Sequence, residues 1–227
     1  MPDAASRVAI VDYGMGNLFS VQRACEQVGL QAAITASPDE VFAADAAILP
    51  GVGAFGDAMA ELTRLGLADA VKTLVAAGKP FMGICLGMQL VMTESVEFGR
   101  HKGLGLVEGD VVRFESPRRG TQVLKVPEVG WNRIAPAPGV SWDGSCLEGL
   151  PDGAFMYFVH SFYAKPADPS VVLSVSRYGH LEFCSSLRRG NLFACQFHPE
   201  RSGPQGLHIY RAFAAHVHRS PMEVPHV

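Results

Sequence analysis

The sequence predicts an α/β fold, with a mostly parallel central sheet flanked by helices and an antiparallel β-rich second half. Within the first 93 residues, three short apolar runs each lead into a turn and then into apolar residues at helical spacing. This βαβαβα order is typical of a parallel sheet with helices on both faces. From about residue 105 onward, short strand-like runs alternate with Gly, Pro and Asp turns, which favours antiparallel pairing.

The elements of the first half follow from the period of the apolar residues. The run before Asp12 is apolar on both faces, as expected of a central parallel strand. Apolar side chains three to four residues apart precede Gly78, which is placed to end a helix. In chain order we predict strands over residues 7–11, 46–49 and 80–84, and helices over residues 18–28, 57–77 and 86–93.

The second half contains β-rich runs and one closing helix. The runs are linked by turn residues and cover residues 109–114, 123–126, 154–163, 171–178, 181–188 and 191–196. The closing helix is expected over residues 206–218. We therefore expect an N-terminal extension over residues 1–6, one domain over residues 7–219 and a loose C-terminal tail over residues 220–227.

Composition limits the classes of function. The 227 residues are 48% hydrophobic and 18% charged, a globular balance for one domain with a substantial core. The net charge of −3 argues against a nucleic-acid partner. The N-terminus has no signal-peptide pattern, and the longest apolar run, over residues 81–92, is too short to cross a bilayer. We expect a soluble, cytoplasmic protein without a membrane partner.

The cysteines and histidines do not indicate a metal site. Five cysteines are widely scattered without a CxxC pair, which excludes zinc and thioredoxin-like patterns and indicates free thiols. His216 and His218 are two residues apart in the closing helix, so they lie on different faces. The segment Tyr13-Gly14-Met15-Gly16-Asn17 lacks the third glycine of a dinucleotide-binding loop, which excludes NAD. We predict no metal and no cofactor.

The strongest local signal for chemistry is Gly83-Ile84-Cys85-Leu86-Gly87. A nucleophile between small residues, after a strand and before a helix, is typical of a sharp turn that exposes its side chain. The helix N-terminus beneath Cys85 would stabilise a thiolate, and the amide of Leu86 would face a developing oxyanion. Taken alone, the pattern is matched about equally well by a cysteine that is simply buried.

A cysteine nucleophile needs a base, and His198 has the best context for one. It follows an apolar strand in Phe197-His198-Pro199-Glu200, where the proline ends strand pairing. A bent loop would let the carboxylate of Glu200 reach back and hold the imidazole tautomer. With Cys85 at the end of another strand of the same sheet, we predict a Cys85–His198–Glu200 triad.

Two further segments are candidates for the site. The loop Pro50-Gly51-Val52-Gly53 also ends a parallel strand, so it is expected to face Cys85. Its glycines allow backbone amides to approach a substrate or to flip, and we assign a second oxyanion donor to Val52 or Gly53. His160 ends an apolar run and is better explained as a packing or substrate-pocket residue than as a second base.

These segments resemble the class I (triad) glutamine amidotransferases, and more narrowly the glutaminase subunits of imidazole glycerol phosphate synthase. The resemblance runs from about residue 8 to residue 213 and includes Val11-Asp12-Tyr13-Gly14-Met15-Gly16-Asn17-Leu18, Leu49-Pro50-Gly51-Val52-Gly53-Ala54-Phe55, Gly83-Ile84-Cys85-Leu86-Gly87-Met88-Gln89, Gly130-Trp131-Asn132, Phe158-Val159-His160-Ser161-Phe162 and Phe197-His198-Pro199-Glu200.

The resemblance implies a function in histidine biosynthesis. Glutamine would be hydrolysed to glutamate and ammonia, and the ammonia would pass through a tunnel into a (β/α)8-barrel cyclase subunit (HisF-type) in a 1:1 heterodimer. By the same resemblance, Gln89, His160, Ser161 and Phe162 would bind glutamine. The loop at residues 50–53 would be reordered when the partner has ligand bound.

Two positions depart from the family pattern. Glu128 stands where the family usually has histidine, and Arg201 stands where it usually has lysine. The resemblance places both near the partner surface. Three alternatives remain open: an amidotransferase serving another synthase, a cysteine peptidase on the same scaffold, and a non-catalytic binding subunit.

Overall fold

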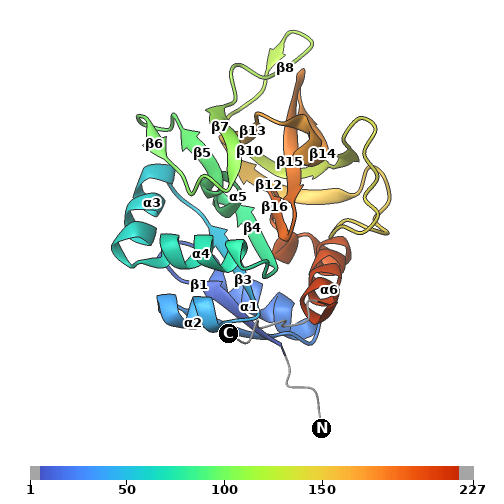
Figure 1. The fold of residues 1–227 in the computed structure, drawn as a ribbon. Helices are drawn as coiled ribbons and strands as arrows, with labels where there is room; N and C mark the ends of the chain where they lie inside the picture. The colour runs from blue at the N-terminus through green and yellow to red at the C-terminus, as the bar shows by residue number, and fades with distance from the viewer. Residues whose placement is uncertain (1–5, 220–227) are drawn as a thin grey trace.

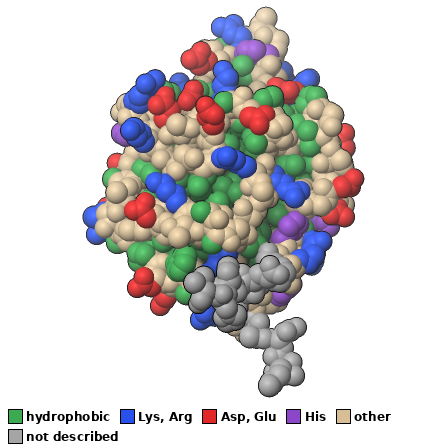
Figure 2. Space-filling view, viewed as in Figure 1, with side chains coloured by type: hydrophobic (Ala, Val, Ile, Leu, Met, Phe, Trp, Pro, Cys, Tyr) green, Lys and Arg blue, Asp and Glu red, His purple; other side chains and the backbone are tan. Residues whose placement is uncertain are grey.

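The computed structural model describes residues 6–219. Most of the predicted N-terminal extension, residues 1–5, and the predicted tail, residues 220–227, lie outside the described residues. Within the described part, none of the helices combines the length and apolar character needed to cross a membrane. On the face drawn in Figure 2, basic and acidic side chains lie interspersed among apolar ones, in keeping with the small net charge.

An eight-stranded sheet forms the centre of the domain (Figure 1). Its strands, in spatial order, are β11 (Ala135–Pro136), β14 (Val172–Tyr178), β15 (Leu181–Arg189), β16 (Leu192–Cys195), β4 (Phe81–Cys85), β3 (Ala46–Gly51), β1 (Arg7–Val11) and β2 (Gln31–Thr35). The five strands from β16 to β2 are parallel, and β11, β14 and β15 pair antiparallel. The predicted mostly parallel central sheet is confirmed.

Helices cover both faces of this sheet through two separate apolar clusters. One cluster packs α1 (Leu18–Gln27) and α6 (Gly203–Arg219) against the sheet, through side chains such as Val21 and Phe213. The other packs α2 (Pro38–Ala43), α3 (Phe55–Arg64) and α4 (Leu67–Ala76), through side chains such as Leu62 and Leu74. Because both faces are covered, the central strands are apolar throughout.

The remaining strands build the β-rich half. A four-stranded sheet consists of β13 (Phe162–Pro166), β7 (Val107–Arg113), β5 (Met92–Ser95) and β6 (His101–Lys102). Two antiparallel pairs consist of β10 (Glu128–Arg133) with β12 (Phe155–His160) and β8 (Arg118–Arg119) with β9 (Gln122–Val123). Short 3-10 turns are η1 (Pro169–Val171) and η2 (Pro199–Arg201). Only β5 with β7 is parallel among the pairs of these smaller sheets in the described residues.

Four predicted elements were wrong in extent. The strand expected over residues 123–126 is only β9, and the other three differences have a physical reason. The helix expected over residues 57–77 is two helices, because Gly66 adopts φ +72° between α3 and α4. The helix expected over residues 86–93 is only α5 (Leu86–Leu90), since Met92 already pairs with Val107 in β5. The strand expected over residues 154–163 is interrupted by a bend at Ser161, which separates β12 from β13.

Helix α2 and the strands β2, β6, β8, β10 and β11 were not predicted at all. β2 is an edge strand with mixed exposure, so its sequence shows no clean apolar period. α2 is a short helix capped by the Ser37 side chain, which accepts a hydrogen bond from the Glu40 amide. The omission of β2 and α2 does not affect the carboxyl edge of the central strands.

The parallel order brings three chain segments together at one edge. Gly51 at the end of β3 is in register with Cys85 at the end of β4. On the other side of β4, Cys195 in β16 is in register with Ile84, so the loop after β16 also emerges beside Cys85. The carboxyl ends of parallel strands are where open α/β sheets bind ligands.

Candidate active site

Cys85 occupies a strained turn between β4 and α5. Its backbone has φ 54° and ψ −108°, a conformation that L-residues rarely adopt. The flanking glycines make the turn possible, because a Cβ at Gly83 would lie 2.9 Å from the Gly87 carbonyl oxygen. A Cβ at Gly87 would collide with the Leu49 carbonyl oxygen. The turn therefore requires both glycines of the sequence pattern.

His198 lies directly after β16, and the turn η2 brings Glu200 back to it. His198 Nδ1 is 2.8 Å from Glu200 Oε1, with the two side chains 5% and 1% exposed. The backbone is fixed by the His198 amide, which donates to the Tyr157 carbonyl, and by the Ser202 hydroxyl, which donates to the His198 carbonyl. Because a carboxylate only accepts, Nδ1 carries the hydrogen and Nε2 is the ring nitrogen left for chemistry.

The electrostatics of His198 favour its protonated form. Burial alone lowers the pKa of His198, but the Cys85 thiolate and the Glu200 carboxylate outweigh burial and raise this pKa to about 10. Nε2 makes no regular hydrogen bond to any described residue, so it remains available to a substrate atom. At neutral pH the site therefore holds His198 as an imidazolium.

Removal of the thiol should lower the pKa of His198. In Cys85→Ala, burial still opposes the charged ring while the attraction of the sulfur is gone, and only Glu200 still raises the pKa. Titration of the ¹⁵N-labelled histidine rings by NMR measures this change, with His180 on a surface turn as the internal control. An unchanged His198 pKa in Cys85→Ala would show that the ring is not coupled to the sulfur.

Gln196 is a residue of the site that sequence analysis missed. Its side chain is fully buried, and its Nε2 donates to Cys85 Sγ at 3.6 Å. Its Oε1 accepts a hydrogen bond from Gln89 Nε2 at 3.1 Å, which fixes the amide orientation. The available signal was a polar side chain at the end of an apolar strand, where burial without partners is costly.

A pocket of about 250 Å³ opens beside Cys85. The residues predicted for the oxyanion and substrate sites all line it: Val52, Gly53, Leu86, Gln89, His160, Ser161 and Phe162. Pro127, Val159 and Glu97 complete the lining. The volume suits a ligand of amino-acid size rather than a drug-sized molecule.

Glu97 was also missed by sequence analysis. Its Oε2 accepts a hydrogen bond from the Phe55 amide at 2.8 Å, which holds the carboxylate at the pocket. A carboxylate placed there can pair with a ligand ammonium group. No local pattern around Glu97 distinguishes it from a solvated surface charge.

The side chain of Tyr13 anchors the start of the loop after β3. The Tyr13 hydroxyl donates to the Pro50 carbonyl at 3.1 Å. Beyond Gly51, the Val52 side chain is 46% exposed and Gly53 has φ +109°. The loop thus combines an anchored start with a glycine at the conformation that only glycine adopts easily.

The other four cysteines are free and buried away from the pocket. Burial raises the pKa of the Cys25 and Cys146 thiols to about 12. Burial also raises the pKa values of Cys184 and Cys195 well above the ordinary thiol range. These thiols stay protonated at neutral pH and are poor nucleophiles.

The described residues contain no group of three or more His, Cys, Asp or Glu side chains that could hold a metal ion.

The two departures from the family pattern lie in different environments. Arg201 follows the triad, and its guanidinium lies 4.8 Å from the centre of the Tyr157 ring. Glu128 is buried and faces His160. The cross-strand register of β10 and β12 turns its side chain inward.

This fold and site define the class of α/β proteins with a cysteine in a strained strand-to-helix turn and a carboxylate-bound histidine at the same edge of the sheet. A family model described as glutamine amidotransferase class-I matches residues 9–217. A protein of Rhodopirellula baltica named imidazole glycerol phosphate synthase subunit HisH is 48% identical over 217 residues, 96% of this chain and 99% of the relative. A protein of the same name from Geobacter metallireducens is 47% identical over 208 residues, 91% of this chain and 97% of the relative. The chain belongs to the class I glutamine amidotransferases and, within them, to the HisH family.

Solved structures agree on the fold. The structure of PurLQS from Thermotoga maritima has a TM-score of 0.72 at 19% identity and covers 94% of this chain and 99% of that chain. The glutaminase domain of Trypanosoma brucei CTPS, solved with bound acivicin, has a TM-score of 0.66 at 17% identity and covers 96% and 95%. At these identities the likeness establishes the fold alone.

Proposed function

We propose that this chain hydrolyses the side-chain amide of L-glutamine through Cys85, His198 and Glu200, as the glutaminase subunit of imidazole glycerol phosphate synthase. The observation that carries the proposal is a thiol in a strained turn, coupled to a carboxylate-bound histidine, at the wall of a pocket of amino-acid size. The relatives in the HisH family are named as subunits of that synthase.

The proposed chemistry uses the proton that His198 holds at neutral pH. Cys85 Sγ attacks the side-chain carbonyl carbon of glutamine, and the carbonyl oxygen becomes an oxyanion. His198 Nε2 gives its proton to the amide nitrogen, the C–N bond breaks, and ammonia leaves a γ-glutamyl thioester. His198 then takes a proton from water, the resulting hydroxide attacks the thioester, and glutamate leaves as the thiolate re-forms.

The pocket residues have separate roles in this scheme. The amides of Leu86 and of Val52 or Gly53 stabilise the oxyanion, each donor contributing about 3 kcal/mol. Gln89, His160, Ser161 and Phe162 hold the substrate. Glu97 pairs with the α-ammonium group, which distinguishes free glutamine from an internal glutamine in a peptide.

The ammonia is used by a partner. We propose a (β/α)8-barrel cyclase subunit (HisF-type) in a 1:1 cytoplasmic heterodimer, which receives ammonia through a tunnel. The loop at residues 50–53 would point its oxyanion-donating amide at the site only when the partner binds ribonucleotide. Glutamine would then not be hydrolysed when no substrate is present to use the ammonia. A missing oxyanion donor corresponds to a rate loss of about a hundredfold.

Copurification with the cyclase subunit, followed by an assay of glutamate release, tests this function. We expect slow release from the complex alone and a large increase when the ribonucleotide substrate is added. Free ammonia should replace this chain in the formation of imidazole glycerol phosphate by the cyclase. A complex that stays inert with glutamine and ribonucleotide would refute the glutaminase role.

A further inference from the structure

A buried acid–base pair lies beside the pocket, and of its two members only His160 has a role in the scheme above. Glu128 and His160 face each other across β10 and β12, where the strand register pairs them. Glu128 Oε2 lies 3.4 Å from His160 Nε2, and the side chains are 5% and 2% exposed. Neither atom has a hydrogen-bond partner elsewhere in the described residues. Both atoms are therefore free to hydrogen-bond each other.

The neighbouring contacts indicate where the proton lies. His160 Nδ1 is 2.8 Å from the Phe162 carbonyl oxygen, which only accepts, so Nδ1 carries a hydrogen. If the His160 ring carried no hydrogen on Nε2, this nitrogen and the carboxylate oxygen Glu128 Oε2 would face each other as two buried acceptors without a donor. Leaving both acceptors unsatisfied is costly. Asn132 Nδ2 donates to Glu128 Oε1 at 2.7 Å, which favours the ionised carboxylate. These contacts favour an imidazolium at His160 paired with a carboxylate at Glu128.

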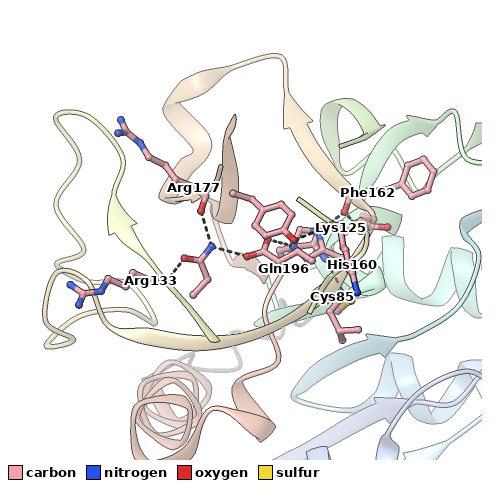
Figure 3. Close-up of polar contacts among 12 residues, drawn as sticks. Cys85, Lys125, Arg133, His160, Phe162, Arg177 and Gln196 are labelled. Atoms are coloured by element: carbon pink, nitrogen blue, oxygen red, sulfur yellow. Dashed lines mark hydrogen bonds and ion pairs between the residues drawn. The ribbon is translucent and has the colours of Figure 1, made fainter. Parts of the chain in front are cut away.

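The pair is connected to the sulfur through a chain of hydrogen bonds (Figure 3). The Phe162 carbonyl that holds His160 also accepts from Gln89 Nε2 at 2.9 Å. Gln89 Nε2 in turn donates to Gln196 Oε1, and Gln196 Nε2 donates to Cys85 Sγ. A shift of the His160 ring would release one of the two donors that fix the Phe162 carbonyl.

We propose that Glu128 is a positioning residue of the glutamine pocket, which acts by holding the His160 ring at Nε2, as an ion pair in the wild type. The ring fixes the Phe162 carbonyl and thereby the pocket wall made by His160, Ser161 and Phe162. Glu128 itself does not line the pocket, so it acts only through His160. The inference rests on the proposed glutaminase function.

Two substitutions at Glu128 separate positioning from packing. Glu128→Met keeps the length and apolar stem but removes the partner of His160, so KM for glutamine should rise about tenfold while kcat changes less than about threefold. Glu128→Gln can still accept from Asn132 and can donate to the bare Nε2 of a neutral ring, so KM should stay within about twofold of the wild type. Glu182→Met, which removes an exposed carboxylate bound to Arg177 on the neighbouring strand, is the matched control and should change neither constant.

The protonation of His160 is measured independently of activity by ¹⁵N NMR near neutral pH. Both ring nitrogens should be protonated in the wild type and only Nδ1 in Glu128→Met. A neutral His160 in the wild type overturns the ion pair, and an unchanged KM in Glu128→Met overturns the positioning role while the glutaminase function stands. If the wild-type complex releases no glutamate, the proposed function fails, and calorimetric binding of glutamine to wild type and Glu128→Met then decides the positioning role in place of KM.

Discussion

Cys85→Ser should abolish glutamine hydrolysis, with kcat of the complex with the cyclase subunit falling at least about 10³-fold. A serine hydroxyl keeps the size of the thiol but remains protonated beside His198, so no anion attacks the amide carbonyl. The strained backbone at residue 85 already accepts a small side chain, so the fold should be preserved. Steady-state glutamate release, with thermal unfolding measured in parallel, separates loss of chemistry from loss of structure.

Cys25→Ser is the matched control for this substitution. Cys25 is a buried thiol in α1 whose pKa is raised to about 12, first by burial and then by Glu26. Its replacement should leave kcat unchanged. Iodoacetamide at neutral pH should label Cys85 and spare the four other thiols, as read by peptide mass spectrometry. Full glutaminase activity in Cys85→Ser would remove the thiol from the mechanism.

Local sequence was sufficient for the residues whose roles depend on the backbone nearby. The strand before Cys85 and the glycines around it predict the turn, because the steric conflicts lie within a few residues and one adjacent strand. Pro199 predicts the bend that brings Glu200 to His198, two residues away. The parallel sheet could be predicted from the apolar runs because both of its faces are covered.

Residues that act across long sequence separations could not be predicted in the same way. Gln89 and Gln196 are 107 residues apart and meet only because β4 and β16 are neighbours in the sheet. Glu128 faces His160 through the register of β10 and β12, and a shift of one residue would turn it outward. The break between α3 and α4 could have been predicted from local sequence, because Gly66 interrupts the helical spacing of the apolar residues.

Gly51→Ala should lower kcat/KM for glutamine by about a hundredfold or more. An alanine Cβ at this position would collide with the Tyr13 hydroxyl oxygen and lie 3.0 Å from the Leu86 Cβ. Since Gly51 is in register with Cys85, the displacement would move the oxyanion loop and the nucleophile relative to each other. Loss of one oxyanion donor alone lowers kcat about 10²- to 10³-fold.

The second substitution Tyr13→Phe identifies the cause of this loss. Alone, it removes one hydrogen bond to the Pro50 carbonyl and should reduce kcat/KM only a fewfold, in line with about 1 kcal/mol for a hydrogen bond. Combined with Gly51→Ala, it removes the oxygen that obstructs the new methyl group, so the double variant should be at least about tenfold more active than Gly51→Ala. This non-additivity is expected of two residues in contact and is measured by a double-mutant cycle on glutamate release. A double variant no better than Gly51→Ala would mean that the conflict with Leu86, rather than with Tyr13, sets the position of the loop.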